Sequence, residues 1–188
     1  FHELLGLGRH LHAYRSNAQE LPGWPMVFTP EELNEGGQVG PVIDPSIANI
    51  DNDSEKILEL IIPLSNSIKI ARYKNGRVEI LYNNYFDKIE YANEFPRRLI
   101  IDDLNGDNKG EILWTNHLRG IWGMQCDGSP IEGFPKDIFY NNNNLFSAYA
   151  ADTPEALAVD DIDGNGFKDI LKVWDTILFV WEHSEKSK

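Results

Sequence analysis

The chain has 188 residues, of which 41% are apolar, and thirty acidic against seventeen basic residues give a formal net charge of −13. This length and composition suit one substantial domain or two small ones, and the negative charge argues against nucleic acid or anionic membrane surfaces as partners. A single cysteine, Cys126, excludes an internal disulfide framework, and the longest apolar run, at 58–64, is too short to span a membrane.

Four similar segments follow one another along the chain, each with an acid, aliphatic residues, a polar turn and a second apolar and aromatic stretch. The opening acids are Glu3, Glu59, Glu111 and Asp169, which lie 56, 52 and 58 residues apart. A repeat of about fifty residues built from short strands is typical of propeller blades. We therefore predict an all-β fold of four-stranded antiparallel meanders, in approximate units 1–30, 31–90, 91–145 and 146–188, the first and last being partial.

Turn signals separate the predicted strands. Asn75-Gly76 and Asp127-Gly128 are strong hairpin signals, because these residue types tolerate positive φ. Helical periodicity is weak, and only single turns are expected, one near residue 30 after a threonine cap and one near residue 152.

One aromatic phrase recurs between units. LPGWP at 21–25 returns as IEGFP at 131–135, which places Trp24 and Phe134 at equivalent positions after equivalent hairpins. An aromatic residue at such a position favours packing between neighbouring sheets over ligand contact.

The stretch AVDDIDGNGFKDILK at 158–172 contains an alternation of oxygen-bearing side chains. Numbered from Asp161, they fall at positions 1, 3, 5 and 9, with a glycine at position 6, where a sharp bend is needed. Ca²⁺ binds six to eight oxygens, and a tightly curled loop turns alternate side chains inward. The stretch 103–111 repeats the arrangement, with Asn108 at the bend. The predicted ligands are Asp161, Asp163, Asn165, Asp169 and the carbonyl of Phe167, and Asp103, Asn105, Asp107, Glu111 and the carbonyl of Lys109.

A third version of the loop, at 49–59, is stretched by two residues, and the first unit has none. Its weaker candidate ligands are Asn49, Asp51, Asp53 and Glu59. An EF-hand is excluded, because position 12 of the two regular loops is Trp114 or Lys172 instead of a glutamate. Metal-free turns stabilised by Asp and Asn side chains are the alternative interpretation of all three loops.

The segments VDDIDGNGFKDILKV, IDDLNGDNKGEILW and the following CDGSPIEGFP resemble FG-GAP or VCBS repeats, the bladed repeats of integrin α-subunit heads and many bacterial surface proteins. The resemblance covers nearly all of the chain, and the loop is its specific part. It implies a β-propeller with a cation loop between the first two strands of a blade, used outside the cell for adhesion or ligand capture. It also implies that the two sets of loop residues named above are calcium ligands.

About three and a half units are present, fewer than the four to eight blades with which propellers usually close. The chain starts at Phe1, with neither an initiator methionine nor a signal peptide. We therefore expect a processed form or an arc of a larger propeller, completed by further blades from the same or another polypeptide.

Two functions remain open. The first is a secreted, cell-surface or periplasmic Ca²⁺-binding module that captures a protein or glycan. The second is part of a propeller-fold polysaccharide lyase or hydrolase, with candidate bases at His117, beside Arg119 in one inter-strand turn, and at His10 and His12 in the matching turn of the first unit. The sequence contains no GxSxG, HExxH or phosphate-loop motif, which favours the binding module.

Overall fold

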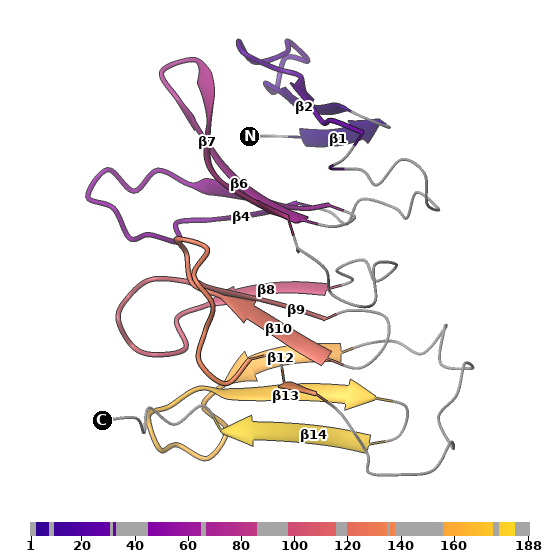
Figure 1. Cartoon of the computed structure of the whole chain (residues 1–188). Coiled ribbons are helices and arrows are strands. Elements are labelled where there is room, and N and C mark those ends of the chain that lie inside the picture. Colours follow the sequence, from indigo (N-terminus) through magenta and orange to yellow (C-terminus); the bar gives the residue numbers. More distant parts are fainter. Residues whose placement is uncertain are drawn as a thin grey trace. The chain divides into compact units, whose positions relative to one another are not determined.

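The computed structural model describes residues 3–7, 10–30, 32, 45–64, 67–85, 98–115, 120–134, 136–137, 156–174 and 177–182. These residues form fourteen strands and no helix, so the predicted all-β class is confirmed (Figure 1). In this part of the chain no helix is long and apolar enough to cross a membrane.

The strands pair into four antiparallel sheets, each built from consecutive strands, as predicted for meanders (Figure 1). The first sheet contains β1 (Glu3–Leu7), β2 (His10–Tyr14) and β3 (Met26–Val27), and the second contains β4 (Ser46–Ala48), β5 (Glu59–Pro63), β6 (Ser67–Lys74) and β7 (Arg77–Tyr85). The third contains β8 (Arg98–Asp102), β9 (Glu111–Thr115), β10 (Gly120–Met124) and β11 (Lys136–Asp137), and the fourth contains β12 (Ala156–Asp160), β13 (Asp169–Trp174) and β14 (Ile177–Glu182). Among the described strands, no hydrogen-bonded pairing joins one sheet to another.

The chain divides into two compact units. Unit 1 comprises Phe1–Asn49 and Asp53–Phe95, and it contains the first two sheets. Unit 2 comprises Ile50–Asn52 and Pro96–Lys188, and it contains the third and fourth sheets. The four repeat units predicted from the sequence are shorter than these two compact units, and their boundaries stay a prediction.

The core of unit 1 lies between the first and second sheets. Apolar residues alternate along β2, so that Leu11 and Ala13 are buried on one face while His10 is exposed on the other. The shared core consists of Leu11, Ala13, Trp24, Met26, Phe28, Leu60, Ile62, Leu64 and Ala71. Each large aliphatic residue buried in this way contributes about 1.5–3 kcal/mol to folding.

The core of unit 2 lies between the third and fourth sheets. Its buried residues are Leu104, Leu113, Ile121, Ile131, Leu157 and Ile170, with Ile100, Phe134, Val159 and Trp181 packed against them. Alternation along β13 points Ile170 into this core and leaves Leu171 on the opposite face of the sheet.

The two aromatic phrases adopt the same turn. The N–H of Trp24 donates to the carbonyl of Leu21 at 3.2 Å, and the N–H of Phe134 donates to the carbonyl of Ile131 at 3.2 Å. Trp24 is 8% exposed within the core of unit 1, and Phe134 packs against the core of unit 2. The prediction that both are packing residues is confirmed.

The hairpin signals also lie in turns. Asn75 and Gly76, with φ of 53° and 76°, connect β6 to β7. Gly128, with φ of 83°, follows β10, where Asp127 accepts hydrogen bonds from the N–H and hydroxyl of Ser129.

One local prediction was wrong, and another falls outside the described residues. His10 and His12 lie within strand β2, not in a turn, because burial of Leu11 and Ala13 extends the strand through them. The turn expected near residue 152 falls at 151–155, outside the described residues, and from Ala156 onward the chain forms strand β12, whose alternation buries Leu157.

The turn expected near residue 30 is present and anchors a buried ion pair. The N–H of Thr29 donates to Glu32 Oε2 at 2.8 Å, and the N–H of Glu32 donates to the hydroxyl of Thr29 at 3.3 Å, the reciprocal pattern of a capping box. The Glu32 carboxylate also pairs with Lys69 and accepts from Asn83 Nδ2 at 3.0 Å. The Glu32 and Lys69 side chains are 3% and 7% exposed, and the Lys69 ammonium lies 5.2 Å from the ring centre of Phe28.

We predict that Glu32→Gln destabilises the protein by about 3–5 kcal/mol, because it leaves the Lys69 ammonium buried without its counter-charge. The control is Glu55→Gln, which removes the partner of Lys74 in an exposed pair and should cost less than about 1 kcal/mol. Urea unfolding of both variants measures the difference. Equal losses would contradict the prediction.

The same pair predicts a pH dependence. Burial by itself raises the pKa of Glu32, but the hydrogen bonds from Lys69 and from the N–H of Thr29, with the charge of Lys69, outweigh it and lower the net pKa below 4.5. A carboxyl whose pKa is lowered by folding stabilises the native state above its unfolded pKa and loses that contribution as the pH falls through the folded value. The gap between wild type and Glu32→Gln should therefore shrink in acid.

Candidate metal site

The acid-rich loops occupy equivalent places in three sheets. Residues 103–111 connect β8 to β9, residues 161–169 connect β12 to β13, and the stretched loop leads from β4 to β5. Each loop therefore joins the first two strands of its sheet. The last residue of each regular loop is also the first residue of the second strand.

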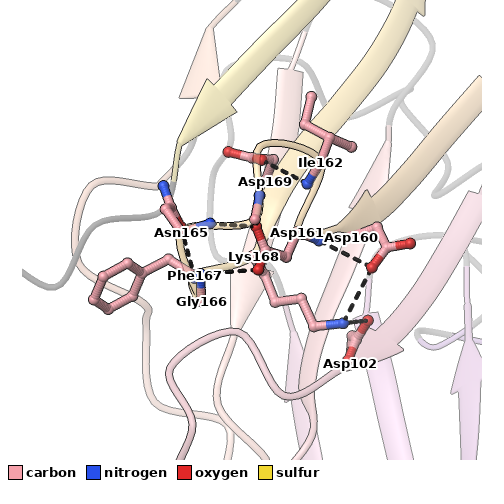
Figure 2. Close-up of polar contacts among 10 residues, drawn as sticks. Asp102, Asp160, Asp161, Ile162, Asn165, Gly166, Phe167, Lys168 and Asp169 are labelled. Atoms are coloured by element: carbon pink, nitrogen blue, oxygen red, sulfur yellow. Dashed lines mark hydrogen bonds and ion pairs between the residues drawn. The ribbon is translucent and has the colours of Figure 1, made fainter.

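Loop 161–169 curls around the carboxylate of Asp161 (Figure 2). This carboxylate accepts three backbone hydrogen bonds, from positions 4, 5 and 6: Gly164 at 2.8 Å, Asn165 at 3.0 Å and Gly166 at 2.8 Å. Asp169 Oδ2 accepts from the N–H of Ile162 at 3.1 Å. The side chains at both ends of the loop thus hold its backbone in place.

Loop 103–111 makes the same hydrogen bonds 58 residues earlier. Asp103 accepts from the N–H groups of Gly106 at 2.7 Å, Asp107 at 3.1 Å and Asn108 at 2.8 Å. Glu111 Oε2 accepts from the N–H of Leu104 at 2.7 Å. The oxygens at positions 3 and 5 of both loops likewise accept from the N–H two residues later: Asn105 from Asp107, Asp107 from Lys109, Asp163 from Asn165 and Asn165 from Phe167.

Two positions in each loop have a left-handed backbone. At position 6, Gly166 has φ of 90° and Asn108 has φ of 67°, which confirms the predicted bend. At position 4, Gly164 and Gly106 have φ of 76° and 78°. The sequence interpretation did not use position 4, although a glycine there in both loops was the available signal.

Loop 161–169 gathers three carboxylates. Oxygens of Asp161, Asp163 and Asp169 all lie within 4.8 Å of one another, and Asp169 is only 3% exposed. Among the described residues no lysine or arginine forms an ion pair with these three acids. Lys168 points instead toward Asp160, at 3.7 Å, and Asp102, at 3.5 Å (Figure 2). The cluster could hold a metal ion.

Loop 103–111 does not gather its carboxylates in the same way, despite its matching backbone. No group of three forms among Asp103, Asp107 and Glu111 in the described structure. Asn105 Nδ2 donates to Glu111 Oε1 at 3.2 Å, so this carboxylate oxygen already accepts a hydrogen bond from a side-chain amide. Glu111 is 1% exposed. Burial raises the pKa of Glu111, and the charges of Asp107 and Asp103 raise it further. The hydrogen bond from the N–H of Leu104 lowers the pKa but does not outweigh these effects.

The stretched loop has a different arrangement. Asp53 Oδ1 accepts from the N–H of Ile57 at 3.2 Å, and Asp53 Oδ2 pairs with Arg72 at 3.7 Å. Asn49 and Asp51 are partly buried, and Glu59 is fully buried. No described trio of carboxylates forms here, and the weaker metal site stays a prediction.

Three contacts of the loops were missed in the sequence. Glu182 at the end of β14 accepts from Asn165 Nδ2 at 3.2 Å, which brings a further carboxylate to the edge of loop 161–169. At position 8 of loop 161–169, Lys168 pairs with Asp102. At position 8 of loop 103–111, the N–H of Gly110 donates to the carbonyl of Ile50 at 2.8 Å. A Cβ on Gly110 would lie 2.7 Å from Ile101, so only glycine fits.

The donor set suits a hard cation. Every side-chain candidate in loop 161–169 offers carboxylate or amide oxygen, the ligands that Ca²⁺ and Mg²⁺ prefer. Asp161 Oδ1 accepts two N–H groups, from Gly164 and Asn165, whereas Oδ2 accepts only that of Gly166. Asp161 Oδ2 therefore keeps a lone pair for a cation, and the hydrogen bonds of Asp161 are compatible with metal binding through this oxygen. The carbonyls of Phe167 and Lys109 stay predicted ligands.

The predicted gathering of the candidate histidines is not tested by the described residues. His117 and Arg119 lie outside them, and His10 and His12 belong to strand β2.

Comparison with known proteins gives no match to a protein-family model, a curated protein or a solved structure.

We predict that Glu111→Gln stabilises the metal-free protein increasingly as the pH rises above about 4.5. The pKa of Glu111 is raised by folding, so the native state holds this proton more tightly than the unfolded state. The contribution of Glu111 to stability is therefore fully present below the unfolded pKa and falls as the pH rises through the folded value.

Urea unfolding in chelator between pH 4 and 8 measures the effect. Asp127→Asn serves as a control of opposite sign. Hydrogen bonds from Ser129 lower the pKa of Asp127, so this variant should lose stability relative to wild type as the pH rises. A Glu111→Gln curve that runs parallel to wild type would refute the prediction.

Proposed function

We propose that the chain is a calcium-stabilised β-propeller module of the FG-GAP or VCBS type that presents a non-catalytic binding surface for a protein or glycan. The observation that carries the proposal is the cluster of Asp161, Asp163 and Asp169. Three carboxylates within 4.8 Å, one of them buried, repel one another unless a cation or protons compensate their charge. The described lysines and arginines do not supply that cation.

Calcium is the ion that this chemistry favours. The loop is short, built of oxygen ligands and partly open to solvent, and Ca²⁺ accepts such irregular, flexible coordination more readily than Mg²⁺. Loop 103–111 has the same backbone, so it forms a second candidate, in which the Asn105 amide would have to turn its oxygen toward the ion in place of the nitrogen that now faces Glu111. Sites of this kind with modest affinity fill at the calcium concentration outside cells, which supports a secreted, cell-surface or periplasmic location.

The faces of the sheets support blade-like stacking. In the third sheet the face that carries Leu113 and Ile100 is covered by the fourth sheet. The corresponding face of the fourth sheet carries Leu171, which pairs with Ala158 and Val180. On this face Leu178 is 56% exposed and Val180 is 46% exposed. A further blade, from this or another polypeptide, would cover it as the fourth sheet covers the third.

Calcium should raise the thermal stability of the chain. With Kd values of about 10⁻⁴–10⁻³ M, 10 mM calcium stabilises by roughly 1.5–3 kcal/mol relative to chelator. This corresponds to an increase of about 3–10 °C in Tm for a chain of this size. Calorimetry in calcium and in chelator measures the shift, and magnesium should produce a smaller one.

The double variant Asp161→Asn and Asp163→Asn should lose the part of the calcium response that loop 161–169 supplies. Asp127→Asn, which removes a carboxylate from an exposed turn outside the loops, should keep it. The proposal is overturned if chelation leaves the wild-type Tm unchanged, or if the double variant responds as wild type does.

The binding role is tested with glycan arrays and with extracellular-matrix proteins, each probed in calcium and in chelator. We expect retention of a ligand that chelator abolishes, because the loops order one rim of the blades. Polysaccharide incubated with the calcium-loaded chain should stay intact. Release of shortened or unsaturated products would instead establish the lyase or hydrolase function.

A further inference from the structure

Strand β2 carries a second group of candidate metal ligands, far in sequence from the acid-rich loops. His10, His12 and Tyr14 alternate along the strand, so their side chains lie on the same face, opposite the buried Leu11 and Ala13. His10 is exposed, and the His12 side chain is 20% exposed. Solvent and ions can therefore reach this face at the histidines.

The two imidazoles are close enough to share one ion. Their ring centres lie 6.0 Å apart, with planes inclined by 80°. Two imidazoles that bind the same ion through nitrogens at about 2.0–2.1 Å have ring centres roughly 5 Å apart. Because His10 is exposed, rotation of its side chain closes the difference without moving the strand.

His12 is already oriented for coordination. Its Nδ1 donates to Glu20 Oε1 at 2.6 Å, which places the proton on Nδ1 and leaves Nε2 as the free ligand atom. The ring of Tyr14 lies parallel to that of His12 within 9°. Metal-binding histidines usually have such a carboxylate on the nitrogen that does not bind metal, where it orients the ring and strengthens the ligand.

We propose that His10 and His12 bind a divalent transition-metal ion, with Glu20 as the outer carboxylate that orients His12. Imidazole nitrogen selects Cu²⁺, Ni²⁺ or Zn²⁺ over Ca²⁺ and Mg²⁺, so this site is chemically distinct from the acid-rich loops and does not depend on the proposed function. Among the described residues, no third His, Cys, Asp or Glu forms a ligand group with both histidines, so water or an incoming ligand completes the coordination.

The test is a Cu²⁺ titration of the untagged chain in saturating calcium, which occupies competing oxygen sites. Electron paramagnetic resonance should show one Cu²⁺ coupled to two nitrogens. Either His10→Asn or His12→Asn should remove one coupled nitrogen and weaken binding more than Glu20→Gln does. Glu20→Gln should keep both nitrogens and weaken binding by about 10-fold, as expected for an outer-sphere partner.

His2→Asn is the control, since it removes a histidine outside β2 and should leave the spectrum and affinity unchanged. Exposure of His10 means that His10→Asn should also leave the Tm unchanged, which separates loss of metal from loss of fold. The proposal is overturned if the His10→Asn variant binds copper with unchanged affinity, if His2→Asn abolishes binding, or if the bound copper has only oxygen ligands.

Discussion

A carboxylate buried at the first residue of an inner strand is the constraint on which the loops depend. Glu59, Glu111 and Asp169 begin β5, β9 and β13 and are 0%, 1% and 3% exposed. Removing an ionised carboxylate from water is costly unless hydrogen bonds or a counter-charge compensate. In the two regular loops the N–H at position 2 supplies one hydrogen bond, which closes the loop.

The buried acids Glu32 and Asp169 have opposite electrostatic surroundings. Glu32 meets Lys69, Asn83 and a backbone N–H, so its charge is neutralised within unit 1 and the group acts as a structural anchor. Asp169 meets two further carboxylates instead, and the nearby Lys168 is turned toward acids outside the cluster. A satisfied pair stabilises a fold, whereas an excess of negative charge provides a place for a cation.

The repeated loops are equivalent in backbone but not in their contacts. Their hydrogen bonds correspond one by one, yet position 8 is a buried glycine against Ile101 in one loop and a lysine paired with Asp102 in the other. The orientation of the amides also differs, because Asn105 donates to Glu111 while Asn165 donates to Asp163 and Glu182. The carboxylates also stand at positions 1, 3 and 9 in loop 161–169 and at positions 1, 5 and 9 in loop 103–111, and only the first set forms a trio in the described structure.

The sequence by itself determined the all-β class, the meander order, the left-handed position 6 and the packing role of Trp24 and Phe134. These properties follow from alternation, turn chemistry and spacing, which act between residues near in the chain. Only the tertiary structure decided that Asp161, Asp163 and Asp169 converge, that Glu182 accepts from Asn165, and that Glu20 lies beside His12. Distances between side chains of different strands depend on register and sheet packing, which local sequence patterns do not specify.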